Sequence, residues 1–157
     1  MSKVLDGYNI IVGSIVALGT ALFGVYWYLF AGFLLCNVLD WLTGWYKARV
    51  LKIETSKAGL EGIVRKLGYW IIILISFLLP KMFMSIGKEM FGIELDFMAI
   101  LGWFTLATLL VNEIRSILEN LVESGYEVPT ILIKGLAVTE KLIQSKQDDN
   151  VEDQNQK

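Results

Sequence analysis

The chain has 157 residues, of which 55% are hydrophobic and 19% charged, and its formal net charge is −2. It has no histidine and one cysteine, Cys36, which excludes histidine-based catalysis and an intramolecular disulfide and argues against a thiolate metal site. A slightly acidic chain is also a poor nucleic-acid binder. We therefore predict no catalytic residues, no metal, no cofactor, no nucleic-acid partner and no small-molecule substrate.

The first long apolar segment lies between Asp6 and Asp40, because residues 7–39 carry no charged side chain. About 20 apolar residues span a bilayer, so this segment is too long for one upright crossing and short for two. A glycine followed by aromatic residues at 24–28 suits a break at the membrane interface. We predict helices at about 6–23 and 27–50. Whether the first one spans the membrane or re-enters it stays open.

An aromatic belt and a basic block follow the second predicted helix. Trp41, Trp45 and Tyr46 suit a membrane interface. Positions 47–66 then hold six basic residues against two glutamates, and these six form the basic loop: Lys47, Arg49, Lys52, Lys57, Arg65 and Lys66. The positive-inside rule predicts that this loop is cytoplasmic.

Two further apolar segments predict the third and fourth helices. The third is expected to begin at 63–67 and to continue through Pro80 to Ile86, because proline kinks a membrane helix without necessarily ending it. The loop at 88–96 is acidic, so we place it outside. The fourth is expected at about 95–122, although its uncharged core, 97–111, is only about 22 Å long at about 1.5 Å per residue.

The C-terminal part of the chain is predicted to be an amphipathic helix followed by a polar tail. Gly125 suits the position after a helix end, and Pro129 suits the first turn of the next helix. We predict this last helix at about 130–144, in the cytoplasm. Residues 145–157 are mostly polar and charged, so they are predicted to form a disordered acidic tail.

Asp40 is the polar residue that a membrane helix tolerates least. It lies about 9 Å inside the cytoplasmic end of the second helix, and a carboxylate at a helix centre costs about 2.5–3.5 kcal/mol on insertion scales. Asn37, Asp40 and Gly44 share one stripe of the helix, which Thr43 flanks. Either Asp40 pairs with a basic residue such as Lys47 or Lys66 and fixes packing, or the stripe lines a pore.

Two other helix faces combine polar or small residues. On the fourth helix, Asn112, Ser116 and Asn120 recur every four positions, with Glu113 beside them, and we expect this polar face to dock on another helix or on the basic loop. On the first helix, small residues form a stripe that lets helices approach closely. That stripe indicates either self-association or the ordinary composition of a membrane helix, and its members are Gly13, Ala17, Thr20 and Gly24.

Two blocks of the sequence resemble the phage-holin family often titled toxin secretion/phage lysis holin. The first block combines an Asp-x-x-Thr-Gly helix end with a basic loop that contains serine and glycine. The second combines Asn-Glu-x-x-Ser-Ile-x-Glu-Asn with Gly-x-x-Val-Pro. The resemblance covers roughly residues 24–135, and the matching positions are Asp40, Thr43, Gly44, Ser56, Gly59, Gly62, Lys66, Asn112, Glu113, Ser116, Asn120, Gly125 and Pro129.

The resemblance implies a small phage-encoded protein that accumulates in the host cytoplasmic membrane and catalyses nothing. Its partners would be the lipid bilayer, other copies of itself and, in some systems, an antiholin. Copies would assemble and open a lesion through which an endolysin, or in some relatives a toxin, crosses. The family has no residue with an assigned chemical role that could be carried over, so the matching positions are candidates for structure or assembly.

The sequence thus predicts an all-α integral membrane protein with three to four membrane helices, a cytoplasmic amphipathic helix and a disordered tail. We expect a multi-pass membrane domain at 1–144 and a cytoplasmic tail at 145–157. A non-lytic membrane module, such as a holin antagonist or a small channel or secretion factor, would show the same motifs. The sequence does not favour a membrane enzyme, because it lacks the cluster of catalytic groups that an enzyme needs.

Overall fold

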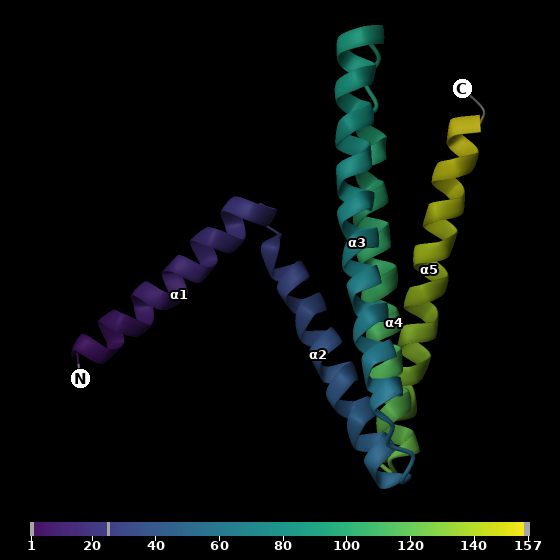
Figure 1. Cartoon of the computed structure of the whole chain (residues 1–157). Helices are drawn as coiled ribbons and strands as arrows, with labels where there is room; N and C mark the ends of the chain where they lie inside the picture. Colours follow the sequence, from purple (N-terminus) through teal and green to yellow (C-terminus); the bar gives the residue numbers. More distant parts are fainter. Residues whose placement is uncertain (1, 25, 156–157) are drawn as a thin grey trace. The chain divides into compact units, whose positions relative to one another are not determined.

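The computed structural model describes residues 2–24 and 26–155, with side chains except at 2–6, 18–19, 21–23, 58 and 146–155. All elements in these ranges are helical, as predicted from the sequence (Figure 1). The main helices are α1 (Ser2–Phe23), α2 (Trp27–Val50), α3 (Ser56–Ile86), α4 (Ile100–Glu123) and α5 (Thr130–Asn155). A π-helix, η1 (Gly87–Phe91), and a 3-10 helix, η2 (Asp96–Ala99), lie between α3 and α4.

The chain divides into two compact units, with the boundary inside α2 between Leu35 and Cys36. In the first unit, α1 ends where the sequence predicts a break. Gly24 has φ 72° and donates its N–H to the carbonyl of Thr20 at 2.9 Å. Glycine adopts this left-handed conformation without a Cβ clash. The small-residue stripe at 13, 17, 20 and 24 is exposed, and its role in self-association stays a prediction.

In the second unit, α3 and α4 lie side by side and α5 returns along α4 (Figure 1). The rings of Phe77 and Trp103 meet edge to face across the α3–α4 interface, with centroids 5.0 Å apart. A Cβ on Gly102 would lie 2.7 Å from the Phe77 ring, closer than carbon atoms can approach. The absence of a side chain at position 102 therefore permits this close packing.

The start of α3 differs from the sequence prediction, because the helix begins at Ser56 and not at 63–67. The family resemblance implies a basic loop with serine and glycine at these positions, which include Gly59 and Gly62. Each glycine costs only about 1 kcal/mol in a helix, and Lys57 and Glu61 form an i,i+4 ion pair at 3.9 Å. The helix then passes through the buried Pro80 to Ile86, as predicted.

The connection between α4 and α5 follows the predicted glycine and proline signals. Gly125 has φ 91° and donates its N–H to the carbonyl of Val122 at 2.9 Å, while Tyr126 donates to Leu121 at 3.0 Å. This pair of bonds is the Schellman pattern, which satisfies the last carbonyls of a helix. α5 starts directly after Pro129 and extends past the expected end at 144 to Asn155. The predicted disorder of the tail stays a prediction.

Two helical segments of the described chain are long and apolar enough to cross a membrane, Gly59–Phe91 and Asp96–Glu123. They correspond to the third and fourth predicted membrane helices. α3 has 31 residues, which gives about 46 Å at about 1.5 Å per residue, whereas the hydrocarbon core is about 30 Å thick. Part of α3 must therefore extend beyond the hydrocarbon. Crossings by α1 and α2 stay predictions.

Candidate functional site: a polar cluster that joins three helices

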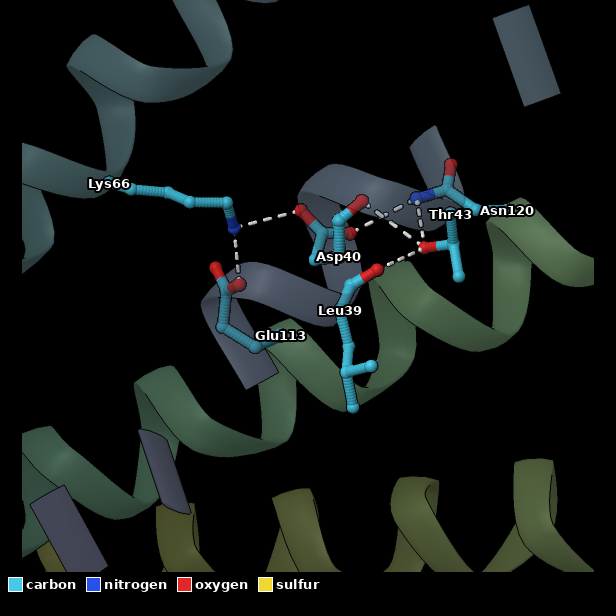
Figure 2. A network of polar contacts seen from close by, with 6 residues as sticks. All are labelled: Leu39, Asp40, Thr43, Lys66, Glu113 and Asn120. Atoms are coloured by element: carbon cyan, nitrogen blue, oxygen red, sulfur yellow. Dashed lines mark hydrogen bonds and ion pairs between the residues drawn. The ribbon is translucent and has the colours of Figure 1, made fainter. Parts of the chain in front are cut away.

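Five polar side chains from α2, α3 and α4 meet in the second unit, and we call them the polar cluster: Asp40, Thr43, Lys66, Glu113 and Asn120 (Figure 2). Lys66 of α3 is at its centre. Its Nζ donates to Oδ2 of Asp40 at 2.8 Å and also to Oε2 of Glu113. One ammonium group therefore bridges carboxylates from the two other helices.

Asn120 makes a second link between α4 and α2. Its Nδ2 donates to Oδ1 of Asp40 at 3.0 Å and to Oγ1 of Thr43 at 3.4 Å. The Thr43 hydroxyl is itself turned toward its own helix, with the carbonyl of Leu39 2.9 Å away. Both carboxylate oxygens of Asp40 consequently have a donor from a different helix, Lys66 on one side and Asn120 on the other.

The cluster is withdrawn from the surface of the described chain. The side chains of Lys66 and Asp40 are 15% and 16% exposed, and that of Glu113 is 4% exposed. Two carboxylates share one ammonium, so the ionised cluster carries one net negative charge. A buried charge is costly unless it is paired and hydrogen-bonded. Each of these three groups therefore depends on the other two.

The spacing of the residues explains how the cluster forms. Glu113 and Asn120 are seven positions apart on α4, which is two helical turns, so they point to the same side. Asp40, Lys66 and Glu113 each lie ten positions from the nearest end of their helix, or about 15 Å at about 1.5 Å per residue. Equal distances from the helix ends place the three charges at a common level.

The structure separates the members of the predicted stripe on α2. Asp40 and Thr43 belong to the cluster, and Gly44 lies against it, since a Cβ there would be 3.5 Å from Nδ2 of Asn120. Asn37 is buried outside the cluster. Of the two partners suggested for Asp40, the geometry selects Lys66.

The polar face predicted on α4 is also divided. Asn120 reaches the cluster and Ser116 lines a cleft beside it. Asn112 is exposed and lines a small cavity that Glu140 of α5 also lines. Sequence reasoning grouped Asn112 with the other two by its four-residue spacing and did not identify Glu113 as the main ionic partner. The seven-residue spacing from Glu113 to Asn120 could have indicated that these two residues lie on the same side of α4.

Most of the basic loop does not enter the cluster. Lys47 pairs with Glu123 of α4 at 3.5 Å, and the Arg49 guanidinium lies 5.3 Å from the centroid of the Trp45 ring. The Lys47–Glu123 pair is partly exposed, and ion pairs near the surface contribute about 0–1 kcal/mol. Lys66 is therefore the member of the basic loop that the structure brings into a buried ionic contact, among those whose side chains are described.

Residues 17–141 match the bacteriophage holin family. The chain belongs to this family. The matched stretch contains the whole polar cluster, so the relationship predicted from two motif blocks is confirmed. An uncharacterized protein of Halalkalibacterium halodurans is 30% identical to this holin over 117 residues, which cover 74% of the chain and 82% of that protein. No solved structure matches the chain. Family membership indicates a phage-holin-type membrane protein, and holins are generally not enzymes.

Proposed function

We propose that this holin assembles with copies of itself in the host cytoplasmic membrane and opens a lesion. An endolysin, or a toxin in a secretion system, then crosses that membrane, and the protein itself catalyses nothing. The observation that carries the proposal is the polar cluster. It places Lys66 and Glu113 within the two helical segments that are long and apolar enough to cross a membrane, and it pairs Lys66 with Asp40 of α2, in a chain from the holin family. Such groups are rare in membrane segments and mark functional sites.

The cluster explains how a single copy can accumulate in lipid. Asp40, Lys66 and Glu113 satisfy one another inside one chain, so lipid does not contact an unpaired charge. The same groups can serve assembly, because contacts to Lys66 and Asn120 hold the part of α2 that belongs to the second unit against α3 and α4. If α2 exchanges these partners with another copy, the charges stay paired and come to face a shared, water-filled interior.

The proposed topology follows from charge. The basic loop is cytoplasmic by the positive-inside rule, so the acidic loop at 88–96 lies outside and α4 returns to the cytoplasm. α1 and α2 contribute one or two further crossings, and the C-terminal tail is cytoplasmic. The stripe of small residues on α1 offers a surface for close helix association.

Inducible expression in a bacterium tests the proposal directly. Membrane potential and culture density are recorded with the holin alone and with a co-expressed endolysin. We expect an abrupt loss of potential in both cultures and rapid lysis only where endolysin is present. Intact potential over many generations of full expression would refute lesion formation. If the chain instead delays lysis by a co-expressed holin, it is an antagonist. An antiholin partner, if there is one, would in turn delay the lysis that this chain causes.

A further inference from the structure

A cleft of about 680 Å³ lies between the end of α2, the connection at 51–55, the start of α3 and one face of α4. Three glycines line it. A Cβ on Gly59 or on Gly62 would meet no atom within 4 Å, and a Cβ on Gly44 would meet only the side chain of Asn120, at 3.5 Å. A larger side chain at Gly59 or Gly62 would therefore have open space beside it.

The cleft lies where a membrane helix meets the headgroup region. Trp41 and Trp45 line it, and both are exposed, at 44% and 48%. Tryptophan is enriched at the membrane interface, because its ring is apolar and its N–H is polar. Lys47 follows within the same wall. In the proposed topology the molecules present at this level are the headgroups of the inner leaflet.

The charges of the wall are balanced. At its deep end the lining charges are Asp40 and Lys66 of the polar cluster, which pair with each other at 2.8 Å. Its outer part combines two cations, Lys47 and Arg65, with two carboxylates, Glu54 and Glu61. A ligand of single charge would meet groups of its own sign, whereas a ligand with one positive and one negative group complements both.

We propose that this cleft binds a phospholipid headgroup that carries both a phosphate and a primary ammonium, as phosphatidylethanolamine does. The proposal rests on the membrane placement given under the proposed function. Lys47 and Arg65 contact the phosphate, and Glu54 and Glu61 accept hydrogen bonds from the ammonium. The pair of Glu61 with Lys57, at 3.9 Å, is exposed, and the pair of Lys47 with Glu123, at 3.5 Å, is partly exposed. Pairs with this access to solvent are weak, so the ligand can replace them.

Filling the cleft provides the steric test. Gly62→Leu places a side chain in the open space, and Gly68→Leu is the matched control, because it lies on the same helix, is also open around its Cβ and does not line the cleft. Leucine favours helix over glycine, so both variants should fold, which circular dichroism checks. The purified full chain is mixed with micelles that contain phosphatidylethanolamine, phosphatidylglycerol or phosphatidylcholine, and retained lipid is counted by native mass spectrometry.

We expect the wild type and Gly68→Leu to retain phosphatidylethanolamine, and Gly62→Leu to retain about tenfold less. A tenfold loss of affinity corresponds to about 1.4 kcal/mol. Phosphatidylcholine, whose ammonium has no hydrogen to donate, should bind like the filled variant. Equal retention by Gly62→Leu, or a preference for phosphatidylglycerol, would overturn the proposal. If soluble phosphoethanolamine binds as tightly as the lipid, the ligand of the cleft need not be a lipid, and the proposal of a lipid headgroup is wrong.

Charge variants test the two ends of the headgroup separately. Arg65→Gln and Glu54→Gln should each weaken retention, whereas Arg49→Gln, which lies outside the wall, should not. If neither cleft variant differs from Arg49→Gln, the assigned contacts are wrong. None of these measurements uses lysis. Failure to bind therefore leaves the lesion proposal intact, and failure to lyse cells leaves the binding result intact.

Discussion

Lys66 and Asp40 are 26 positions apart in the chain, and their Nζ and Oδ2 atoms lie 2.8 Å apart. The same ammonium also reaches Glu113, 47 positions further along the chain from Lys66. One side chain thus holds carboxylates from α2 and α4 against α3. Because the three groups are mostly buried, removing the cation leaves two carboxylates close together without a counter-charge.

Lys66→Met should therefore destabilise the protein by about 3–5 kcal/mol, the usual cost of breaking a buried ion pair on one side. Thermal unfolding in detergent, followed by circular dichroism, measures this loss. Lys57→Met is the matched control, because the Lys57 side chain is 87% exposed and its pair contributes little. Neutralising the carboxylates as well, with Asp40→Asn and Glu113→Gln, should restore most of the stability. An unchanged unfolding temperature for Lys66→Met would show that the cluster is not buried in the folded protein.

Asp40→Ala should change assembly and not only stability. It removes the acceptor for both Lys66 and Asn120, so α2 loses its ion pair with α3 and keeps toward α4 only the longer Asn120–Thr43 contact and the Lys47–Glu123 pair. We expect a different distribution of cross-linked oligomers in membranes and a shifted time of lysis after induction. Asp96→Ala, in the loop between α3 and α4, is the control. A wild-type ladder together with wild-type timing would make Asp40 a tolerated charge without a role in assembly.

The helices were largely predictable because their signals are local. The uncharged stretches, Gly24, Gly125 and Pro129 place most helix ends within a few residues, apart from the early start of α3 and the end of α5 at Asn155 instead of 144. The cluster was only partly predictable. A stripe shows that Asp40 needs a partner, but its choice between Lys47 and Lys66 depends on how α2 packs against α3. Periodicity alone does not contain that information.

The same limit applies to the partners on α4. Glu113, Ser116 and Asn112 all lie near one another along the sequence, yet only the rotation of α4 about its axis decides which one faces Lys66. That rotation is fixed by packing elsewhere, including the contact of Gly102 with Phe77. The cleft was not predictable either, because its walls come from three separate segments of the chain.

Lys52→Gly should stabilise the end of α2. Lys52 has φ 57°, and the next residue, Ile53, donates its N–H to the carbonyl of Ala48 at 2.9 Å, so Lys52 occupies the left-handed position of a Schellman motif. A non-glycine residue in this conformation costs about 1–2 kcal/mol. We expect a gain of about 1 kcal/mol in unfolding free energy. Lys57→Gly, within α3, is the control and should lower the unfolding free energy. If Lys52→Gly lowers it as well, the left-handed conformation assigned to Lys52 is wrong.

Gly102→Ala should separate α3 from α4 locally. The added methyl would lie 2.7 Å from the Phe77 ring, and overpacking of this kind costs about 1–3 kcal/mol. Gly68→Ala, with open space around its Cβ, should be neutral or stabilising. Unfolding in detergent compares the two. If Phe77→Leu restores the stability of Gly102→Ala, the ring contact is the cause, and if it lowers stability further, another contact is responsible.

The end of α5 should leave α4 when the protein is in lipid. Ile143 and Gln144 border the same small cavity as Thr108 and Val111, so α5 reaches the apolar part of α4 there, and its residues beyond Gln144 extend further in that direction. Those residues include Lys146, Asp148, Asp149, Glu152 and Asp153.

On insertion scales, each aspartate or lysine costs about 2.5–3.5 kcal/mol at the centre of a membrane helix. Lipid therefore excludes this segment, whereas Arg115 and Glu140 can keep the first half of α5 in place near the interface. In lipid nanodiscs, amide hydrogens of 145–155 should exchange quickly and those of 132–142 slowly. Equal protection in both halves would show that α5 stays on α4 along its whole length, and that this face of α4 is in contact with water and not with lipid.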